Sequence, residues 1–250
     1  MISAPSGAPR WVEASIGRVG GAARYDGIAE WYDREHADSE LGRAARAIVL
    51  RLLGEGPGRL LDLGCGGGAH AAAFAGRGWS VTGVDESEAQ LRLARARGVD
   101  AVRADAAALP FEAGSFDAGV SMFTHTDVDG FGAALGELAR VLKPRAPFVY
   151  LGVHPCFVGP HSLFVAGRGV PTLHPGYRES GRYAEAPGVT PDGIRARVGA
   201  VHLPLAPFVQ AFLDAGFGLE RLEEPGSRPY PWILATRWHK TGRGRADTGS

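Results

Sequence analysis

The stretch RLLDLGCGGGAHA, residues 59–71, carries the residue types best suited to hold a nucleotide-containing ligand. It begins with a short apolar run, typical of a buried strand in a parallel sheet, that is interrupted by Asp62. Four glycines within residues 64–68 then permit a sharp turn and a close approach of a ligand to the backbone. An alanine-rich run through Ala75 predicts a helix whose N-terminus faces that ligand. Together these features predict a cradle for a nucleotide-containing cofactor.

Two classes of cofactor fit this spacing. Gly64, Gly66 and Ala69 satisfy the G-x-G-x-x-G/A fingerprint of dinucleotide binding, and Asp85 follows about twenty residues later. The same residues also fit the looser D-x-G-x-G-x-G pattern of S-adenosylmethionine binding. Asp62 favours the second class, because a carboxylate repels a pyrophosphate but attracts an ammonium and a sulfonium group. A buried aspartate that merely caps a loop is the alternative, so both classes stay open at this point.

Composition restricts the class of protein. The 250 residues suffice for one large domain or two small ones, and a hydrophobic content of 45% is ordinary for a soluble globular protein. The 27 basic and 27 acidic residues balance, which disfavours a nucleic-acid partner. Apolar runs are too short to cross a membrane, and the two cysteines do not suggest a disulfide scaffold. We therefore expect a cytoplasmic protein with no membrane partner, either a monomer or a homodimer.

Strand-like and helix-like segments alternate along the chain, which predicts a parallel α/β sheet with its ligands at the carboxyl ends of the strands. Besides the strand before the glycine turn, strands are expected at 80–84, 99–103, 116–121, 148–153, 217–222 and 232–238. Helices are expected at 25–33, 41–53, 87–98, 131–142 and 207–216.

Residues 155–200 break this alternation. They are rich in proline and glycine and contain the aromatic residues Phe157, Phe164, Tyr177 and Tyr183. A loop of this length inside a compact domain is usually functional or disordered, and its aromatic side chains favour a lid that packs on something. Residues 1–20 and the polar tail are expected to be loosely ordered.

Five motifs, in this order, resemble those of the class I S-adenosylmethionine-dependent methyltransferases: LLDLGCGGG (60–68), VTGVDES (81–87), RADAAALPF (103–111), SFDAGVS (115–121) and LARVLKP (138–144). The resemblance covers roughly residues 25–238. It implies a Rossmann-like sheet of seven strands, mostly parallel with an antiparallel terminal strand, with helices on both faces and a lid insertion after strand five. One departure is Pro144-Arg145-Ala146, where many members have Pro-Gly-Gly. It affects a turn at the end of the sheet opposite the ligands.

The resemblance also implies a division of the chain into parts. Residues 1–250 would form a single methyltransferase domain. Its core would span about 41–154 and 201–238, with an N-terminal cap at 21–40, the lid insertion at 155–200 and a loose tail at 240–250.

The implied cofactor is S-adenosyl-L-methionine. Asp62 and the glycine turn would hold its methionine part, and Asp85 would accept hydrogen bonds from the ribose hydroxyls, as an acid at the end of a second strand does in dinucleotide binders. The cofactor-binding residues implied in this way are Asp62, Gly64, Cys65, Gly66, Asp85, Glu86, Asp105, Ala106, Ser121, Met122, Tyr32 and Tyr25.

The remaining implied roles have simple structural alternatives. Asp105 would receive the adenine amino group, with the backbone N–H of Ala106 donated to the ring, but an aspartate here can also cap a loop. Tyr32 would lie against the cofactor carboxylate with help from Tyr25, although either ring can instead cover the core. Ser121 and Met122 would lie beneath the cofactor.

Methyl transfer from a sulfonium is an in-line displacement, so positioning supplies most of the catalysis and no metal is required. A hydroxyl acceptor benefits from a general base, and a histidine suits neutral pH. His154, at the end of the fifth strand, is the first candidate, and His125, after the fourth strand, is the second. An ordinary loop histidine is the alternative for each. The insertion and its exit add His161, His174 and His202, whose spacing matches no recognised metal site.

The primary hypothesis is a small-molecule methyltransferase that acts on oxygen or nitrogen in specialised metabolism. The aromatic lid suits a small organic acceptor, and Arg168, Arg178 and Arg182 are available for an anionic one. The first alternative is an NAD(P)-dependent oxidoreductase, and the second is a non-catalytic cofactor-binding module. A macromolecular methyltransferase is disfavoured by the neutral charge.

Overall fold

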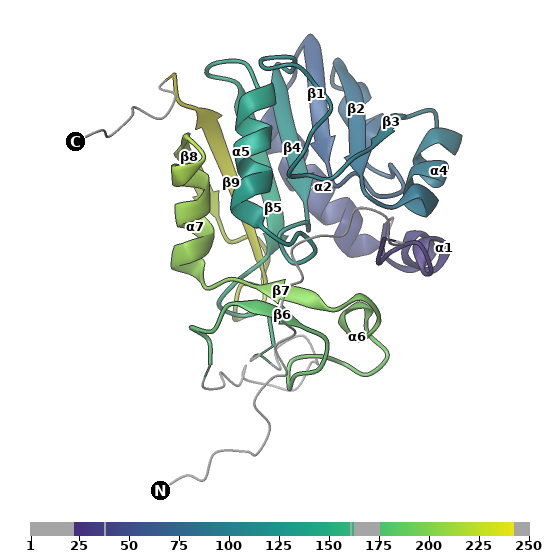
Figure 1. Ribbon diagram of the computed structural model, residues 1–250, viewed down its shortest axis with the longest axis vertical. Coiled ribbons are helices and arrows are strands. Elements are labelled where there is room, and N and C mark those ends of the chain that lie inside the picture. The colour runs from purple at the N-terminus through teal and green to yellow at the C-terminus, as the bar shows by residue number, and fades with distance from the viewer. Residues whose placement is uncertain (1–22, 38, 161, 163–175, 243–250) are drawn as a thin grey trace, which may run out of the picture.

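The computed structural model describes residues 23–37, 39–160, 162 and 176–242. Seven strands form one sheet in the order β3-β2-β1-β4-β5-β9-β8 (Figure 1). Strands β1 to β5 run parallel, whereas β9 runs antiparallel to both of its neighbours, β5 and β8. This confirms the predicted mixed sheet, and it places the one antiparallel strand inside the sheet. The bounds are β1 Gly58–Leu63, β2 Trp79–Asp85, β3 Asp100–Arg103, β4 Ala118–Met122, β5 Pro147–Val153, β8 Phe217–Glu223 and β9 Ile233–Lys240.

The helices follow the predicted segments closely. Ser87 caps the start of α4, because its side chain accepts a hydrogen bond from the backbone N–H of Gln90. The last helix starts at Leu205, two residues before Pro207, because proline is tolerated in the first turn of a helix. The bounds are α1 Ala29–Tyr32 with a π-helical turn at Asp33–Ala37, α2 Glu40–Leu53, α3 Ala71–Ala75, α4 Glu88–Ala96, α5 Phe131–Val141, α6 Ile194–Val198 and α7 Leu205–Asp214.

The sheet is covered by helices on both faces, and alternate residues of each strand supply the two cores. Leu60 and Val149 pack with α2 and α3, whereas Leu61 and Phe148 pack with α5 and α7. The second core is strongly aromatic. Its buried rings belong to Phe116, Phe131, Phe148, Tyr150, Phe208, Phe212, Phe217 and Trp238.

The insertion after β5 contains structure that the sequence did not predict. Two short strands, β6 Gly181–Tyr183 and β7 Ala200–His202, pair antiparallel, and α6 lies between them in the chain. In Figure 1 this ribbon lies beyond the lower end of the large sheet, where β5 ends and the insertion begins. Four residues singled out in the sequence lie outside the described residues: His161, Phe164, Arg168 and His174. Residues 1–22 and 243–250 also lie outside them.

The Pro144-Arg145-Ala146 turn keeps a backbone geometry that glycine normally supplies. Arg145 adopts a positive φ of 63°, and its backbone N–H donates to the carbonyl of Lys240 at 3.0 Å. The turn therefore joins the start of β5 to the end of β9 without glycine. Within the described residues, the model has no helix with the length and apolar character needed to cross a membrane.

Adjacent residues of α7 offer a matched test of the aromatic core. Phe212 is fully buried and stacks on Trp238 with ring centroids 4.4 Å apart, whereas Leu213 is 45% exposed. We expect Phe212→Ala to lower the free energy of unfolding by about 3–5 kcal/mol and Leu213→Ala to change it by less than about 1 kcal/mol, measured by urea denaturation. Equal effects of the two substitutions would contradict the assigned burial.

Candidate functional site

The glycine turn after β1 has the geometry expected of a cradle. Gly64, Gly66 and Gly68 all have positive φ, at 76°, 52° and 73°, which L-residues rarely adopt. A Cβ added to Gly64 would also lie 2.1 Å from the Cγ2 of Thr124. Only glycine therefore satisfies both the backbone conformation and the packing at Gly64.

A pocket opens beside this turn at the carboxyl ends of β1 and β4. Its walls include six of the residues that the resemblance assigned to the cofactor: Tyr32, Asp62, Gly64, Cys65, Gly66 and Met122. Gly67, Ala69 and His70 complete the lining. Burial raises the pKa of the Cys65 thiol, so this side chain contributes to the wall as a neutral group.

Asp62 is the unusual member of this wall. Its side chain is 4% exposed and has no hydrogen-bond or ion-pair partner among the described residues. Burial, followed by repulsion from Asp85, raises its pKa to about 7. A buried carboxylate without a partner is costly, and a cationic ligand in the pocket would offset that cost.

Asp85 is held in a fixed orientation at the end of β2. Its Oδ2 accepts from the backbone N–H of Gly66 at 3.0 Å, and its Oδ1 accepts from the N–H of Ser87 at 2.9 Å. Burial raises its pKa to about 6, although these two hydrogen bonds act in the opposite direction. Each oxygen keeps a further lone pair, so the carboxylate can still accept hydrogen bonds from a ligand. The neighbouring Glu86 side chain is exposed.

The residues predicted near the adenine and the reacting centre have local structural partners. Asp105 is exposed, and its Oδ1 accepts from the N–H of Ala107 at 2.8 Å, as in the loop-cap alternative. Ala106 is half-buried on the following turn. Ser121 is buried, and its hydroxyl donates to the carbonyl of Leu63 at 2.9 Å. Ser121 thus connects β4 to β1 and does not line the pocket.

The two tyrosines of the N-terminal cap differ in role. Tyr32 lines the pocket, and burial raises its pKa to about 12, so its hydroxyl stays protonated. Tyr25 does not line the pocket. Its hydroxyl donates to Asp127 Oδ1 at 3.1 Å, and its ring meets the Tyr32 ring edge-to-face at 5.2 Å. Tyr25 therefore packs against Tyr32 and helps to hold its ring in the pocket wall.

His125, the second predicted general base, lies in the aromatic core. Its side chain is 2% exposed, its Nδ1 hydrogen-bonds the Tyr150 hydroxyl, and its ring contacts Phe131 and Phe208. Burial lowers its pKa to about 3. A histidine that is neutral and enclosed in this way has a packing role.

His154 lies at the predicted rim, but both of its ring nitrogens are occupied. Nδ1 accepts from the backbone N–H of Cys156 at 3.1 Å, so Nε2 carries the proton and donates to Glu224 Oε1 at 2.8 Å. Burial lowers the pKa of His154, although Glu224 acts in the opposite direction. In this arrangement His154 is a neutral donor that holds a carboxylate in place.

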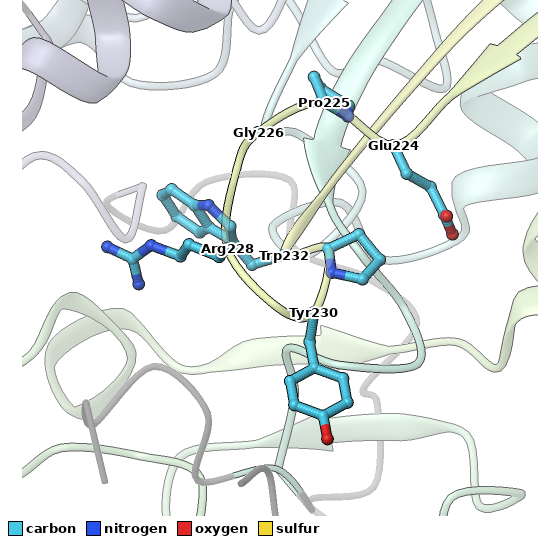
Figure 2. Close-up of a pocket in the computed structure, with 7 residues that line it drawn as sticks. Glu224, Pro225, Gly226, Arg228, Tyr230 and Trp232 are labelled. Carbon is cyan, nitrogen blue, oxygen red and sulfur yellow. The ribbon is translucent and has the colours of Figure 1, made fainter. Parts of the chain in front are cut away.

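Glu224 belongs to a second pocket, formed by the turn between β8 and β9 (Figure 2). In Figure 2 Glu224 lies on one side of the turn, while Arg228 and Trp232 lie together on the other. The Arg228 guanidinium is 5.3 Å from the centre of the Trp232 ring. Because Ile233 pairs with Val153 at the end of β5, this pocket opens at the edge of the sheet where the first pocket lies.

Three features of the site escaped the sequence analysis. Glu224 lies in the proline-rich turn between the last two strands, to which the sequence assigned no role. A carboxylate at the edge of the sheet where ligands bind could have marked it as a candidate site residue. Gln90 is 1% exposed with neither amide atom partnered, and its Oε1 would lie 3.7 Å from a Cβ on Gly66. Phe123, directly after β4, has a φ of 60°, a strained conformation of the kind that clusters at functional sites.

The described residues contain no group of three or more histidine, cysteine, aspartate or glutamate side chains arranged to hold a metal ion. Arg182 pairs with Asp129 at 2.7 Å. The sequence had suggested Arg182 as a binding residue for an anionic acceptor, but Asp129 already neutralises its charge within the protein.

Asp62 yields a prediction about stability and pH. Its folded-state pKa lies above the ordinary value, so the folded protein holds the proton more tightly and its stability falls as the pH rises from about 4 to about 7. We expect Asp62→Asn to raise the free energy of unfolding at pH 8 by on the order of 1–4 kcal/mol, and by clearly less at pH 5, which lies in the lower part of this pH range.

Urea denaturation at the two pH values measures this difference. Asp117→Asn is the matched control of opposite sign, because Lys143 lowers the pKa of Asp117 and its carboxylate is stabilising. A loss of stability at pH 8 in Asp62→Asn would contradict the assignment of an unpaired buried carboxylate.

Comparison with known proteins agrees with this geometry. Residues 61–150 match the family model of a methyltransferase domain. The chain is 35% identical over 142 residues to a demethylmenaquinone methyltransferase from Renibacterium salmoninarum, covering 54% of this chain and 60% of that protein. A protein of the same name from Clavibacter sepedonicus is 37% identical over 139 residues, covering 51% and 56% of the two chains. The chain thus spans less than two thirds of these relatives.

Solved structures extend the similarity over most of the chain. An S-adenosylmethionine-dependent methyltransferase from Mesorhizobium loti superimposes with a TM-score of 0.65 at 24% identity, covering 81% of this chain and 98% of that one. A second from Methanosarcina mazei has a TM-score of 0.57 at 26% identity, covering 78% and 97%. The family model and the solved structures together show that residues 61–150 carry a methyltransferase domain, within a fold that this chain shares with S-adenosylmethionine-dependent methyltransferases.

Proposed function

We propose that this protein transfers a methyl group from S-adenosylmethionine to a small organic acceptor. The observation that carries the proposal is the unpartnered, buried carboxylate of Asp62 in the wall of a glycine-lined pocket. A ligand with positive charge complements this wall, whereas a pyrophosphate in the same place would be repelled. The family match over residues 61–150 supports the same cofactor.

The residues present fit the cofactor. Asp62 and the glycine turn would receive its ammonium end, and the oriented carboxylate of Asp85 would accept from its ribose hydroxyls. Tyr32 would close the pocket as a neutral hydrogen-bond donor. Asp105 and Ala106 remain the predicted contacts for the adenine, and Ser121 would hold the floor through its bond to Leu63.

When bound, S-adenosylmethionine supplies an electrophilic methyl group on a positively charged sulfur. The contribution of this chain is to hold that group in line with the acceptor and to exclude water. Met122 in the first pocket and Trp232 beside the second belong to one apolar cluster, which lies on the α2 face of the sheet. We therefore assign the second pocket, between Glu224 and Trp232, to the acceptor.

An oxygen or nitrogen acceptor must lose a proton during transfer. Glu224 lines the acceptor pocket, and His154 fixes one of its oxygens at 2.8 Å. Because Nδ1 of His154 is already occupied by Cys156, we assign the proton-accepting role to Glu224 and a positioning role to His154. This revises the sequence-based hypothesis, in which the histidine itself was the base.

A carbon acceptor on a quinone-like ring is a second candidate, favoured by the name that the curated relatives share. The aromatic side chains Phe157, Tyr230 and Trp232 around the acceptor pocket suit a planar ring. Acceptors of both kinds therefore belong in a screen that detects S-adenosylhomocysteine as product. Cofactor binding without turnover over that screen would favour the non-catalytic module.

The choice of cofactor has a direct test. We expect S-adenosylhomocysteine at a hundredfold excess over its Kd to stabilise the protein by about 2.7 kcal/mol, which raises Tm by roughly 5–10 °C for a domain of this size. NAD at the same concentration should leave Tm unchanged. Differential scanning fluorimetry measures both, and stabilisation by NAD alone would favour the oxidoreductase and contradict the proposal.

The role of Glu224 can be tested once an oxygen or nitrogen acceptor is found. We expect Glu224→Gln to lower kcat by about 10²–10⁴-fold while cofactor binding stays unchanged, because the amide cannot accept the proton. Glu220→Gln is the matched control, since this residue on β8 pairs with Arg237 away from the pocket. Full activity of Glu224→Gln would show that the acceptor needs no base at this position.

A further inference from the structure

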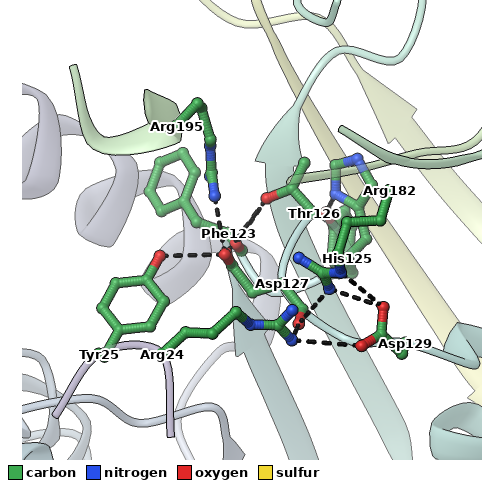
Figure 3. Close-up of polar contacts among 10 residues, drawn as sticks. Arg24, Tyr25, Phe123, His125, Thr126, Asp127, Asp129, Arg182 and Arg195 are labelled. Atoms are coloured by element: carbon green, nitrogen blue, oxygen red, sulfur yellow. Dashed lines mark hydrogen bonds and ion pairs between the residues drawn. The ribbon is translucent and has the colours of Figure 1, made fainter. Parts of the chain in front are cut away.

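The loop after β4 joins two segments that are far apart in the sequence. Within it, the carboxylate of Asp127 is 20% exposed and has partners on both sides (Figure 3). Its Oδ1 accepts from the Tyr25 hydroxyl at 3.1 Å and from Arg195 Nη1 at 2.7 Å. Tyr25 belongs to the N-terminal cap, residues 23–37, and Arg195 belongs to α6 in the insertion. One oxygen atom thus connects the cap with the insertion.

Neighbouring contacts reinforce this connection. Arg24 of the cap donates to the backbone carbonyl of Asp127 and lies 3.5 Å from Asp129, which also pairs with Arg182 of the insertion. The backbone N–H of Val201 in β7 donates to the carbonyl of Thr126 at 2.7 Å. Figure 3 shows that these side chains converge on the loop from two sides.

The cap is in turn part of the cofactor pocket. The Tyr25 ring contacts Tyr32, which lines that pocket. Asp33 forms a bidentate pair with Arg97, whose Nη1 also donates to the carbonyl of Gly67 in the glycine turn at 2.6 Å. A ligand that orders the glycine turn and Tyr32 therefore orders the cap as well.

The loop itself also touches the glycine turn. Thr124, three residues before Asp127, packs its Cγ2 against Gly64. The strained backbone at Phe123 lies between this contact and the end of β4. The loop thus contacts the cofactor pocket at its beginning and carries the shared carboxylate at its centre.

We propose that Asp127 is a positioning residue that couples occupancy of the cofactor pocket to ordering of the insertion, through the shared hydrogen bonds to Tyr25 and Arg195. The inference rests on the proposed function for the identity of the cofactor. It goes beyond that function because it makes the ordering of residues 181–202 depend on the filled cofactor pocket. In thermodynamic terms, the two events favour each other reciprocally.

Hydrogen exchange of the full-length protein measures the coupling without knowledge of the acceptor. We expect saturating S-adenosylhomocysteine to slow amide exchange in peptides that cover residues 181–202 by about 5-fold or more, the lower end of typical allosteric coupling. In Asp127→Ala, which removes the shared acceptor, the cofactor pocket should still be protected by the ligand, but exchange at residues 181–202 should slow by less than about 2-fold.

Two further variants separate coupling from a general loss of stability. Tyr25→Phe removes only the hydrogen bond between the cap and the Asp127 carboxylate and leaves the pair of Asp127 with Arg195, so it should weaken the transmitted protection even where Asp127→Ala fails to fold. Asp117→Asn breaks an ion pair of 2.6 Å with Lys143 outside both pockets and should leave the transmitted protection at the wild-type level.

The outcomes are distinct. Protection of residues 181–202 that is unchanged in both Asp127→Ala and Tyr25→Phe would overturn the inference. So would ligand binding to the wild-type protein that leaves exchange at 181–202 unaltered. If S-adenosylhomocysteine does not bind at all, the proposed function fails together with the inference, whereas binding without transmitted protection overturns the inference alone.

Discussion

The structure depends most on a carboxylate that is almost fully buried in the wall of a pocket. Asp62 lies at the end of a central parallel strand, is almost fully buried and lacks a partner within the described residues. Desolvation disfavours its charged form, as the raised pKa records. The unpaired carboxylate therefore lowers the stability of the ligand-free protein and increases its affinity for a cationic ligand.

The rest of the fold serves to place groups around this charge. Parallel strands bring their carboxyl ends to one edge, so the glycine turn, Asp85 and the loop after β4 meet there although they are distant in sequence. The antiparallel strand β9 adds the turn with Glu224 to the same edge. The two cores lie on the faces of the sheet, whereas these loops lie at its edge. The sequence of the loops can therefore change without disturbing either core.

Much of this arrangement could be predicted from the sequence because it depends on local patterns. The apolar run at β1, the glycines and the capping serine at Ser87 each determine a conformation within a few residues. The position of His125 could not be predicted, since its burial against Tyr150 and Phe208 comes from strand β5 and helix α7, which lie farther along the chain. The position of His125 directly after β4 had suggested a residue at the rim of the ligand site. The partners of His154 and Tyr25 were missed for the same reason, as Glu224 and Asp127 are 70 and 102 residues away.

The position of β9 has a further consequence. Because β9 runs antiparallel to β5 and β8, the connection between β8 and β9 lies at the edge of the sheet that carries the glycine turn. The turn at Arg145 and the end of β9 near Lys240 lie at the opposite edge. Insertions or replacements in residues 224–232 would then change the pocket that we propose for the acceptor, while the sheet order and the glycine turn are preserved. A scaffold of this kind can diversify its chemistry by exchanging one hairpin, and grafting that hairpin between relatives is a rational route to new acceptors.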